Sequence, residues 1–235
     1  AANLGWRNVP LKQMLDDNFG VPLHVANDTT CAGLAETLFG LGKGFHRVCT
    51  IVAEAGVGAG ITISDEQCKE MTNGSAEIGH LKVFMENRWD GFSEREYALE
   101  ELIGKKGLET HLENIAKSTQ DQDLLGLLDS DFNAKIIAEM AQKDNQGAIQ
   151  FINETGIILG KGIAVLINLM HPNVVILSGS ICGLGETLLS SIWDVVRVDA
   201  IDEYIKELEI ITSCLDNNVV LGAAALPLRY ELGLV

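Results

Sequence analysis

The chain contains 235 residues, 47% of them hydrophobic, which suffices for a full core in one large domain or in two lobes. With 17 basic against 33 acidic residues, its net charge of −16 would repel a nucleic-acid backbone. The longest apolar stretch, from Ile163 to Met170, is interrupted by Asn168, and the first residues lack the features of a signal peptide, so we expect a cytoplasmic protein without a membrane span.

The cysteines stand at positions 31, 49, 68, 182 and 214, and no two of them form a Cys-x-x-Cys pair. Their odd number, wide spacing and apolar surroundings are typical of buried free thiols. We therefore expect neither a disulfide framework nor a cysteine zinc site.

The first part of the chain predicts two helices, each followed by a strand. Apolar spacing indicates a short helix over Pro10–Phe19, which ends at Gly20, and then a strand over Val21–Ala26. A second helix is predicted over Thr29–Phe39, and the nearly continuous apolar run Arg47–Glu54 predicts a buried strand.

Asn27-Asp28 stands between the first predicted strand and the second predicted helix. One interpretation is a helix N-cap, which Asn and Asp both favour. The other is a functional carboxylate at the C-terminal end of a strand, where the crevice of an α/β fold lies. The local pattern leaves both open.

Three glycines at alternate positions, Gly56, Gly58 and Gly60, lie between two β-branched runs. They predict a strand, a turn and a second strand, and the turn could present backbone N–H groups to an anion. The alternative is a tight hairpin in which the glycines serve only backbone geometry. Glu77-Ile78-Gly79-His80 follows, and its polar residues favour a functional interpretation.

The remaining chain alternates helices with strands, which argues for an α/β architecture. The expected elements, in order, are a helix over 94–103, a break at Lys105–Gly107, two or three amphipathic helices over 109–143, a long helix over 146–170, a strand over 174–177, a turn at Ser178–Ser180, a helix over 185–196, a strand over 208–212 and a closing helix over 219–232.

Taken together, six elements in order resemble the ROK family of sugar kinases and sugar-responsive repressors, from Asn3 to Leu228. They are Leu4-Gly5-Trp6 with Val9-Pro10-Leu11, Asn27-Asp28 with Leu34-Ala35-Glu36, Gly56 to Ile61, Glu77 to His80, Ser178-Gly179, and Leu221 to Ala224. The resemblance implies an actin-like, ribonuclease H-like two-lobe sugar kinase fold with an incomplete N-terminal lobe. Residues 1–45 would be the remainder of that lobe, 46–217 the larger C-terminal lobe with a helical insertion near 94–143, and 218–235 the closing helix.

The resemblance also implies roles for matching residues. Asp28 matches the catalytic aspartate that takes the proton from the attacking sugar hydroxyl in a kinase. Asn27 would hold a neighbouring hydroxyl, and Glu77 and His80 match residues that contact the sugar. The nucleotide would be contacted by the glycines of a second phosphate loop and by a small-residue turn, which correspond to Gly56, Gly58, Gly60, Ser178 and Gly179.

The family's zinc motif is altered in this sequence. If the motif is aligned to end at Leu99-Glu100, its cysteine positions hold Gly91, Ser93 and Ala98, so we expect no structural zinc and no other metal site. His80 is then free of zinc, and Glu100 falls on a further sugar-contacting glutamate, although a solvated helix face is an equal alternative for Glu100.

Two further departures concern the phosphates. Family kinases carry Gly-Thr where this chain has Glu54-Ala55, and a carboxylate there would repel a phosphate unless it points away or meets a cation. The family's opening Asp-x-Gly-Gly-Thr loop is also missing from these residues, so we expect a piece of a longer protein that lacks half of an ATP site.

These observations favour the sugar-sensing and oligomerising part of a ROK-type transcriptional regulator. Its DNA-binding helix-turn-helix would lie upstream, and a homodimer or homotetramer is implied by the family. The alternative is a kinase of a hexose or N-acetylhexosamine that uses ATP and Mg²⁺, with Asp28 as the base, and a third is a paralogue that binds neither ligand. The sequence does not identify the sugar.

Overall fold

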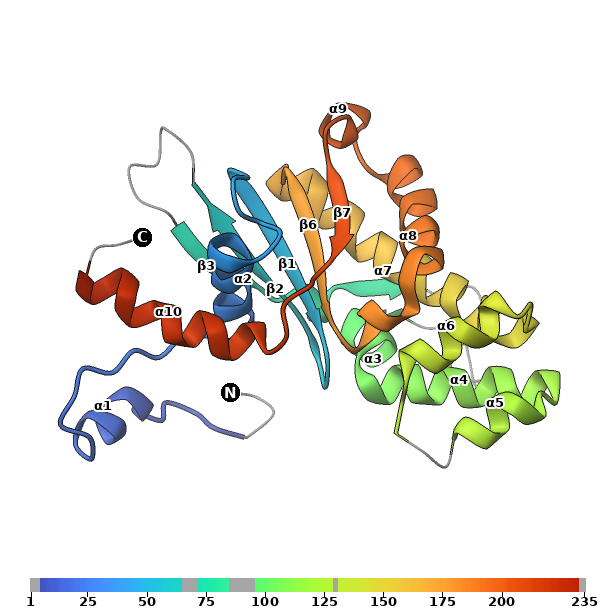
Figure 1. Cartoon of the computed structure of the whole chain (residues 1–235), viewed down its shortest axis with the longest axis horizontal. Helices are drawn as coiled ribbons and strands as arrows, with labels where there is room; N and C mark the ends of the chain where they lie inside the picture. The colour runs from blue at the N-terminus through green and yellow to red at the C-terminus, as the bar shows by residue number, and fades with distance from the viewer. Residues whose placement is uncertain (1–4, 65–71, 85–95, 129–130, 233–235) are drawn as a thin grey trace.

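One mixed β-sheet organises the molecule in the computed structural model, which describes residues 5–64, 72–84, 96–128 and 131–232 (Figure 1). Its five strands lie in the order β3-β2-β1-β6-β7. They are β1 (Arg47–Ala53), β2 (Val57–Ile63), β3 (Thr72–Ala76), β6 (Val174–Gly179) and β7 (Glu209–Thr212). β6 and β7 continue the sheet parallel to β1, whereas β2 and β3 add antiparallel strands on its other side. β1 is buried over almost its whole length, as its apolar run predicted.

Helices cover both faces of this sheet. Cys49 and Ile51 of β1 point into a core shared with α7 (Gln146–Met170) and α8 (Gly185–Asp199). The opposite face of β1 and β2 is covered by α2 (Asp28–Phe39). The alternation along β1 therefore separates two cores, one on each side of the sheet.

The predicted closing helix is α10 (Asn218–Leu232), which packs across α2 (Figure 1). A Cβ atom on Gly222 would lie 1.7 Å from the carbonyl oxygen of Cys31, so the two helix backbones touch directly at this glycine. Cys31 and Leu34 of α2 bury their side chains against Ala225 of α10. The close approach makes α2 and α10 one packed layer.

The helices predicted over 109–143 are α4 (Lys105–Thr119), α5 (Gln122–Leu127) and α6 (Ala134–Gln142). The predicted break at Lys105–Gly107 is wrong, because these residues form the first turn of α4. The chain turns at Gly104 instead, which is extended and separates α4 from α3 (Leu99–Ile103).

The helix predicted over 94–103 is also wrong in its first half. Residues Glu96–Ala98 form β5, which pairs with β4 (Lys82–Phe84) in a separate two-stranded sheet. Tyr97 and Ala98 of this short strand are both buried. Residues 94 and 95 lie outside the described part of the chain.

The strand predicted over Val21–Ala26 is not formed in the structure. The segment has no strand assignment, and the side chains of Val21 and Val25 are 61% and 50% exposed. An apolar run becomes a strand only beside a partner, and within the described residues the segment instead passes α10, where the ring of His24 stacks on that of Tyr230. The preceding helix, α1 (Leu11–Asp16), is shorter than predicted and contains no buried residue.

Among the described residues, α7 alone is long and apolar enough to span a membrane by length and composition. Of its most apolar window, 61% is buried inside the fold. Its buried face includes Gly156 and Gly160, which lie against α8. This burial is that of a central core helix, as the sequence predicted.

Candidate functional site

A cavity of about 660 Å³ lies where the first turn of α2, the β1–β2 turn, the 3₁₀ helix η2 (Ile78–His80) and α3 meet. Its walls contain every residue for which the sequence predicted a sugar contact. The lining residues are Asn27, Asp28, Thr29, Val52, Glu54, Ala55, Gly56, Val57, Gly58, Glu77, His80 and Glu100. Segments far apart in the sequence therefore meet around one space of a size suited to a small polar ligand.

The N-terminus of α2 supplies Asn27 and Asp28. Asn27 is the N-cap, since its Oδ1 accepts hydrogen bonds from the backbone N–H of Thr29 at 2.8 Å and from the Thr29 hydroxyl at 2.6 Å. Asp28 accepts a bond from the same N–H through Oδ1, also at 2.8 Å. The N-cap interpretation is thus confirmed for Asn27. The other interpretation placed Asp28 at the end of a strand that is not formed, but the carboxylate of Asp28 does line the cavity.

The glycines after β1 mostly serve the packing of α2 on β2. A Cβ atom on Gly60 would lie 2.0 Å from the carbonyl oxygen of Thr29, and one on Gly58 would lie 2.8 Å from the Thr29 methyl carbon. The turn itself is short, with the N–H of Glu54 donating to the carbonyl oxygen of Gly56 at 3.0 Å.

The turn is shorter than the predicted glycine turn from Gly56 to Gly60. β2 begins at Val57, so Gly58 and Gly60 are strand residues. Gly56 and Gly58 still line the cavity, whereas Gly60 does not. The glycines are needed less for backbone dihedrals than to let a helix approach a strand without intervening side chains.

Glu77 precedes the short helix η2 and His80 is its last residue, and the helix is anchored by the buried residues Ile78 and Gly79. A Cβ atom on Gly79 would lie 2.2 Å from the carbonyl oxygen of Val57, so η2 is held directly against β2. The exposed side chains of Glu77 and His80 are consequently presented on the cavity side.

Glu100, on the first turn of α3, also lies in the cavity. Its Oε1 is 3.5 Å from Nδ1 of His80, and its side chain is 33% exposed. The neighbouring Glu101 has a different role, since its Oε2 accepts from the N–H of Ala98 at 2.7 Å and so caps α3. The geometry thus disfavours a purely solvated helix face for Glu100.

A second cavity of about 650 Å³ adjoins the first and shares Val52 and Glu54 with it. Ser178 and Gly179, predicted to contact a nucleotide, both line it, and so does Lys135. The other lining residues are Ser180, Cys182, Gly183, Thr212, Ser213, Cys214, Leu215, Asp216, Asn217, Asn218, Val219 and Val220.

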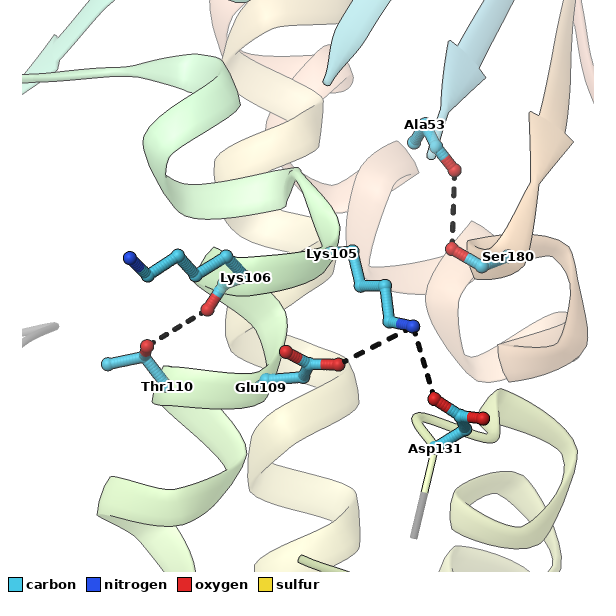
Figure 2. Close-up of polar contacts among 7 residues, drawn as sticks. All are labelled: Ala53, Lys105, Lys106, Glu109, Thr110, Asp131 and Ser180. Carbon is cyan, nitrogen blue, oxygen red and sulfur yellow. Dashed lines mark hydrogen bonds and ion pairs between the residues drawn. The ribbon is translucent and has the colours of Figure 1, made fainter. Parts of the chain in front are cut away.

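The ends of β1 and β6 touch at the boundary of the two cavities. Gly179 has a positive φ of 98°, and a Cβ atom there would lie 2.2 Å from the carbonyl oxygen of Ala53. The Ser180 hydroxyl donates to that same oxygen at 3.3 Å (Figure 2). The carboxylate of Glu54 reaches this boundary too, with Oε1 3.0 Å from the same Cβ position.

Among the described residues, the second cavity is lined by more carboxylates than cations. Its lining contains the carboxylates of Glu54 and Asp216 against the one ammonium of Lys135. A phosphate chain needs backbone N–H groups, cations or a metal around it, so a carboxylate over Gly179 opposes its binding. A cation between Glu54 and a phosphate would offset this repulsion, so ATP and Mg²⁺ for a kinase stay a prediction from the sequence.

Glu36 was not identified from the sequence as part of a site, yet it joins α2 to the second cavity. Its side chain is completely buried, and its Oε1 accepts from the Ser213 hydroxyl and from Nδ2 of Asn218, the latter at 3.4 Å. Asn218 also donates to Ser178 Oγ at 2.8 Å, and Glu36 Oε2 accepts from the N–H of Leu41 at 3.3 Å. A buried carboxylate needs such donors.

Burial keeps the nearby thiols protonated. It raises the pKa of Cys31, with a further increase from the charge of Asp28. Burial also raises the pKa of Cys182 to about 11, and the charges of Glu36 and Glu54 add to this effect. These cysteines are therefore poor nucleophiles and poor metal ligands, as expected of buried thiols.

Within the described residues, no group of three or more His, Cys, Asp and Glu side chains is arranged to hold a metal ion. Ala98, at one aligned zinc position, is a buried residue of β5. Gly91 and Ser93, at the other two, lie outside the described residues, as does Cys68. The absence of a structural zinc stays a prediction from the sequence.

A sequence model of the ROK family matches residues 1–229. The chain belongs to the ROK family. Its fold is accordingly the mixed α/β, actin-like fold of ROK sugar kinases and regulators, and the chain covers part of it.

Curated ROK relatives include both repressors and kinases. The chain is 26% identical to a putative xylose repressor of Caldicellulosiruptor sp., over 96% of this chain and 57% of that protein. It is 29% identical to a glucokinase of Halalkalibacterium halodurans, over 82% and 59%, and to the DNA-binding transcriptional dual regulator NagC of Escherichia coli K12, over 96% and 54%. The chain thus spans less than two thirds of each relative.

Solved ROK structures divide in the same way. A ROK family transcriptional regulator, homologous to the E. coli MLC protein, superposes with a TM-score of 0.78 at 24% identity, over 94% of this chain and 55% of that one. A ROK glucokinase from Streptomyces griseus in complex with glucose and AMPPNP gives 0.74 at 28% identity, over 94% and 73%. Family membership alone therefore does not separate a regulator from a kinase.

Proposed function

We propose that this chain is the sugar-sensing part of a ROK-type transcriptional regulator. The observation that carries the proposal is the contrast between the two cavities. The first brings Asp28, Glu77, His80 and Glu100 together around one space, whereas the second is lined by the carboxylates of Glu54 and Asp216, which would repel a phosphate. A site that binds a sugar without accommodating a phosphate donor suits a sensor.

The first cavity has the chemistry of a polyol site. Its carboxylates accept hydrogen bonds from sugar hydroxyls, and the imidazole of His80 can donate or accept. The carbonyl oxygen of Asn27 is engaged by Thr29, so its amide NH₂ is the group available to a sugar oxygen. Fixed acceptors on three separate elements would select a sugar by the directions of its hydroxyls.

Sensing requires that the sugar bind two conformations of the protein with different affinities. The cavity joins α2 on one side to η2 and α3 on the other. A bound sugar would favour the arrangement in which both sides contact it. Because α2 is linked through Glu36 to Ser213 and Asn218, this preference would also reach β7 and α10.

For the whole protein, we propose that DNA is bound by a helix-turn-helix outside these residues, since a net charge of −16 disfavours DNA contact by this chain. Such a regulator would act in the cytoplasm as a homodimer or homotetramer. Repressors among the relatives support the DNA-binding role.

A kinase remains the second candidate, and the position of Asp28 favours it. Asp28 lines the first cavity together with the other candidate sugar contacts, as the base of a sugar kinase would have to. Glucokinases among the relatives add support. The substrate would be a hexose or N-acetylhexosamine.

The proposed sugar site is tested by isothermal titration calorimetry with a panel of neutral hexoses, pentoses and N-acetylhexosamines. We expect one of them to bind, and we expect Glu77→Ala to weaken that binding at least tenfold. Glu139→Ala, on the exposed face of α6 and outside both cavities, is the matched control. Absence of binding by every sugar would contradict the proposal.

A further inference from the structure

We propose that the first cavity accepts unphosphorylated sugars and rejects sugar phosphates, and that Glu54 is the residue that determines this specificity. The inference rests on the proposed function, in which this cavity binds a sugar. It goes further by naming the class of sugar. A sugar and its phosphate ester differ in charge and in hydrogen-bonding capacity, so the cavity walls can distinguish them.

The charges of the cavity walls provide the first argument. Among the described residues, the lining holds four carboxylates, those of Asp28, Glu54, Glu77 and Glu100, and neither lysine nor arginine. In this part of the chain, His80 is the lining side chain that can become cationic, and its Nδ1 already lies 3.5 Å from Oε1 of Glu100. A phosphate dianion would therefore enter a space of its own sign and be repelled by these carboxylates.

Hydrogen-bonding capacity also disfavours a phosphate in the first cavity. Ionised carboxylates only accept hydrogen bonds, and a phosphate dianion also only accepts them. Sugar hydroxyls, in contrast, donate as well as accept, and an amino sugar adds a cationic donor. The lining is thus complementary to a neutral or amino sugar and opposed to a phosphate ester.

The backbone holds Glu54 at the boundary between the two cavities. Its N–H donates to the carbonyl oxygen of Gly56 at 3.0 Å, and its own carbonyl oxygen accepts from the N–H of Lys105 at 2.8 Å. Its side chain lines both cavities, with Oε1 3.0 Å from the Cβ position of Gly179. A phosphate extending from the first cavity toward the second would meet this carboxylate.

The nearby lysines do not offset this charge. Although the backbone of Lys105 is bonded to Glu54, its ammonium points toward Asp131 and Glu109, at 3.3 and 3.9 Å, and does not line the cavity (Figure 2). Lys135 lines the second cavity only. Within the described residues, the first cavity therefore lacks a cation placed to receive a phosphate.

The test compares matched ligand pairs by calorimetry: glucose with glucose 6-phosphate, N-acetylglucosamine with its 6-phosphate, and mannose with its 6-phosphate. Glucosamine and xylose complete the panel. The proteins are the wild type, Glu54→Gln, Glu54→Thr and the surface control Glu139→Gln, each checked for folding by circular dichroism and thermal unfolding. Glu54 is an exposed turn residue, so its variants should fold.

For the wild type, we expect the phosphate ester to bind at least tenfold more weakly than its parent sugar. In Glu54→Gln and Glu54→Thr, the ratio of the two dissociation constants should fall at least tenfold, whereas Glu139→Gln should keep the wild-type ratio. A higher salt concentration should lower the ratio of the two wild-type dissociation constants, because salt screens the repulsion between the phosphate and the carboxylates.

The possible failures are distinguishable. If a phosphate ester binds the wild type as tightly as its parent sugar, the specificity inference is overturned while sugar sensing stands. If the wild type discriminates but the Glu54 variants keep its ratio, Glu54 is not the determinant. If no sugar binds in either form, the proposed function fails, and the inference fails with it.

Discussion

The first turn of α2 rests directly on β2, because a Cβ atom on Gly60 would lie 2.0 Å from the backbone carbonyl oxygen of Thr29. Thr29 in turn bonds Asn27 and Asp28, which face the cavity. The position of both candidate sugar contacts thus depends on a glycine that does not itself line the cavity. The packing of Gly60 against Thr29 therefore also fixes where Asn27 and Asp28 lie in the cavity.

Gly60→Ala should therefore displace the first turn of α2. Overpacking against a backbone atom costs about 1–3 kcal/mol, so we expect the melting temperature to fall by several degrees and sugar binding to weaken. Gly74→Ala in β3 is the matched control, since a Cβ atom there meets nothing within 4 Å. Equal melting temperatures for the two variants would refute this account of the glycines.

Glu36→Gln should destabilise the fold although it preserves shape. The substitution replaces one carboxylate oxygen by an NH₂ group, which must then face either the N–H of Leu41 or the donors Ser213 and Asn218. An unsatisfied buried donor costs about 1–3 kcal/mol. Urea unfolding at neutral pH measures the loss, with Glu139→Gln as the exposed control, and an unchanged midpoint would contradict the network.

Stability should decrease as the pH falls below about 6.5, because burial lowers the pKa of His111 from its usual 6.5, an effect only partly offset by Glu154. In this range the unfolded chain binds more protons at this residue than the folded chain does, so acid favours unfolding. Nε2 of His111 lies 2.9 Å from Oε2 of Glu154. Burial alone would raise the pKa of the Glu154 carboxyl, but hydrogen bonds from His111 and Gln150 leave that pKa lowered. Glu154 therefore titrates below pH 4.5, outside the range in which His111 acts.

The measurement is the free energy of unfolding of the wild type and of His111→Gln between pH 7 and pH 5. We expect the wild type to lose more stability over this range than the variant. His46→Gln, at an exposed position, should follow the wild type. Parallel profiles for His111→Gln and the wild type would remove His111 as the source.

Alkylation should distinguish the thiols. Cys214 is exposed, whereas burial raises the pKa of Cys49 to about 12 and that of Cys182 to about 11. We expect mass spectrometric mapping after a short iodoacetamide pulse at pH 8 to find Cys214 labelled well before Cys31, Cys49 and Cys182. Early labelling of Cys49 would show that β1 is less protected than the fold implies.

Elements with a strong local pattern could be predicted from the sequence. The apolar run of β1 and the periodic face of α7 each specify burial by themselves, so both appear where they were expected. The segment Val21–Ala26 has a similar run, but a strand also requires a neighbour, which local sequence does not encode. The same reason explains why β5 was mistaken for the start of a helix.

The five sugar-contact candidates were assembled by family resemblance, and the structure brings them to one cavity. Residues that act through distant partners were missed. Glu36 accepts hydrogen bonds from Ser213 and Asn218, which lie far away in the chain, so no local sequence pattern could predict these contacts. Its one signal was a carboxylate within an otherwise apolar helix, which invites a search for buried donors.

The central claim, that the chain senses a sugar and does not phosphorylate it, is tested most directly by pairing calorimetry with a coupled ADP-release assay on the full-length protein. We predict saturable binding of at least one neutral sugar and, at saturating sugar with ATP and Mg²⁺, no ADP release above the rate without sugar. Sugar-dependent ADP release that is abolished by Asp28→Asn would contradict the account and establish the kinase.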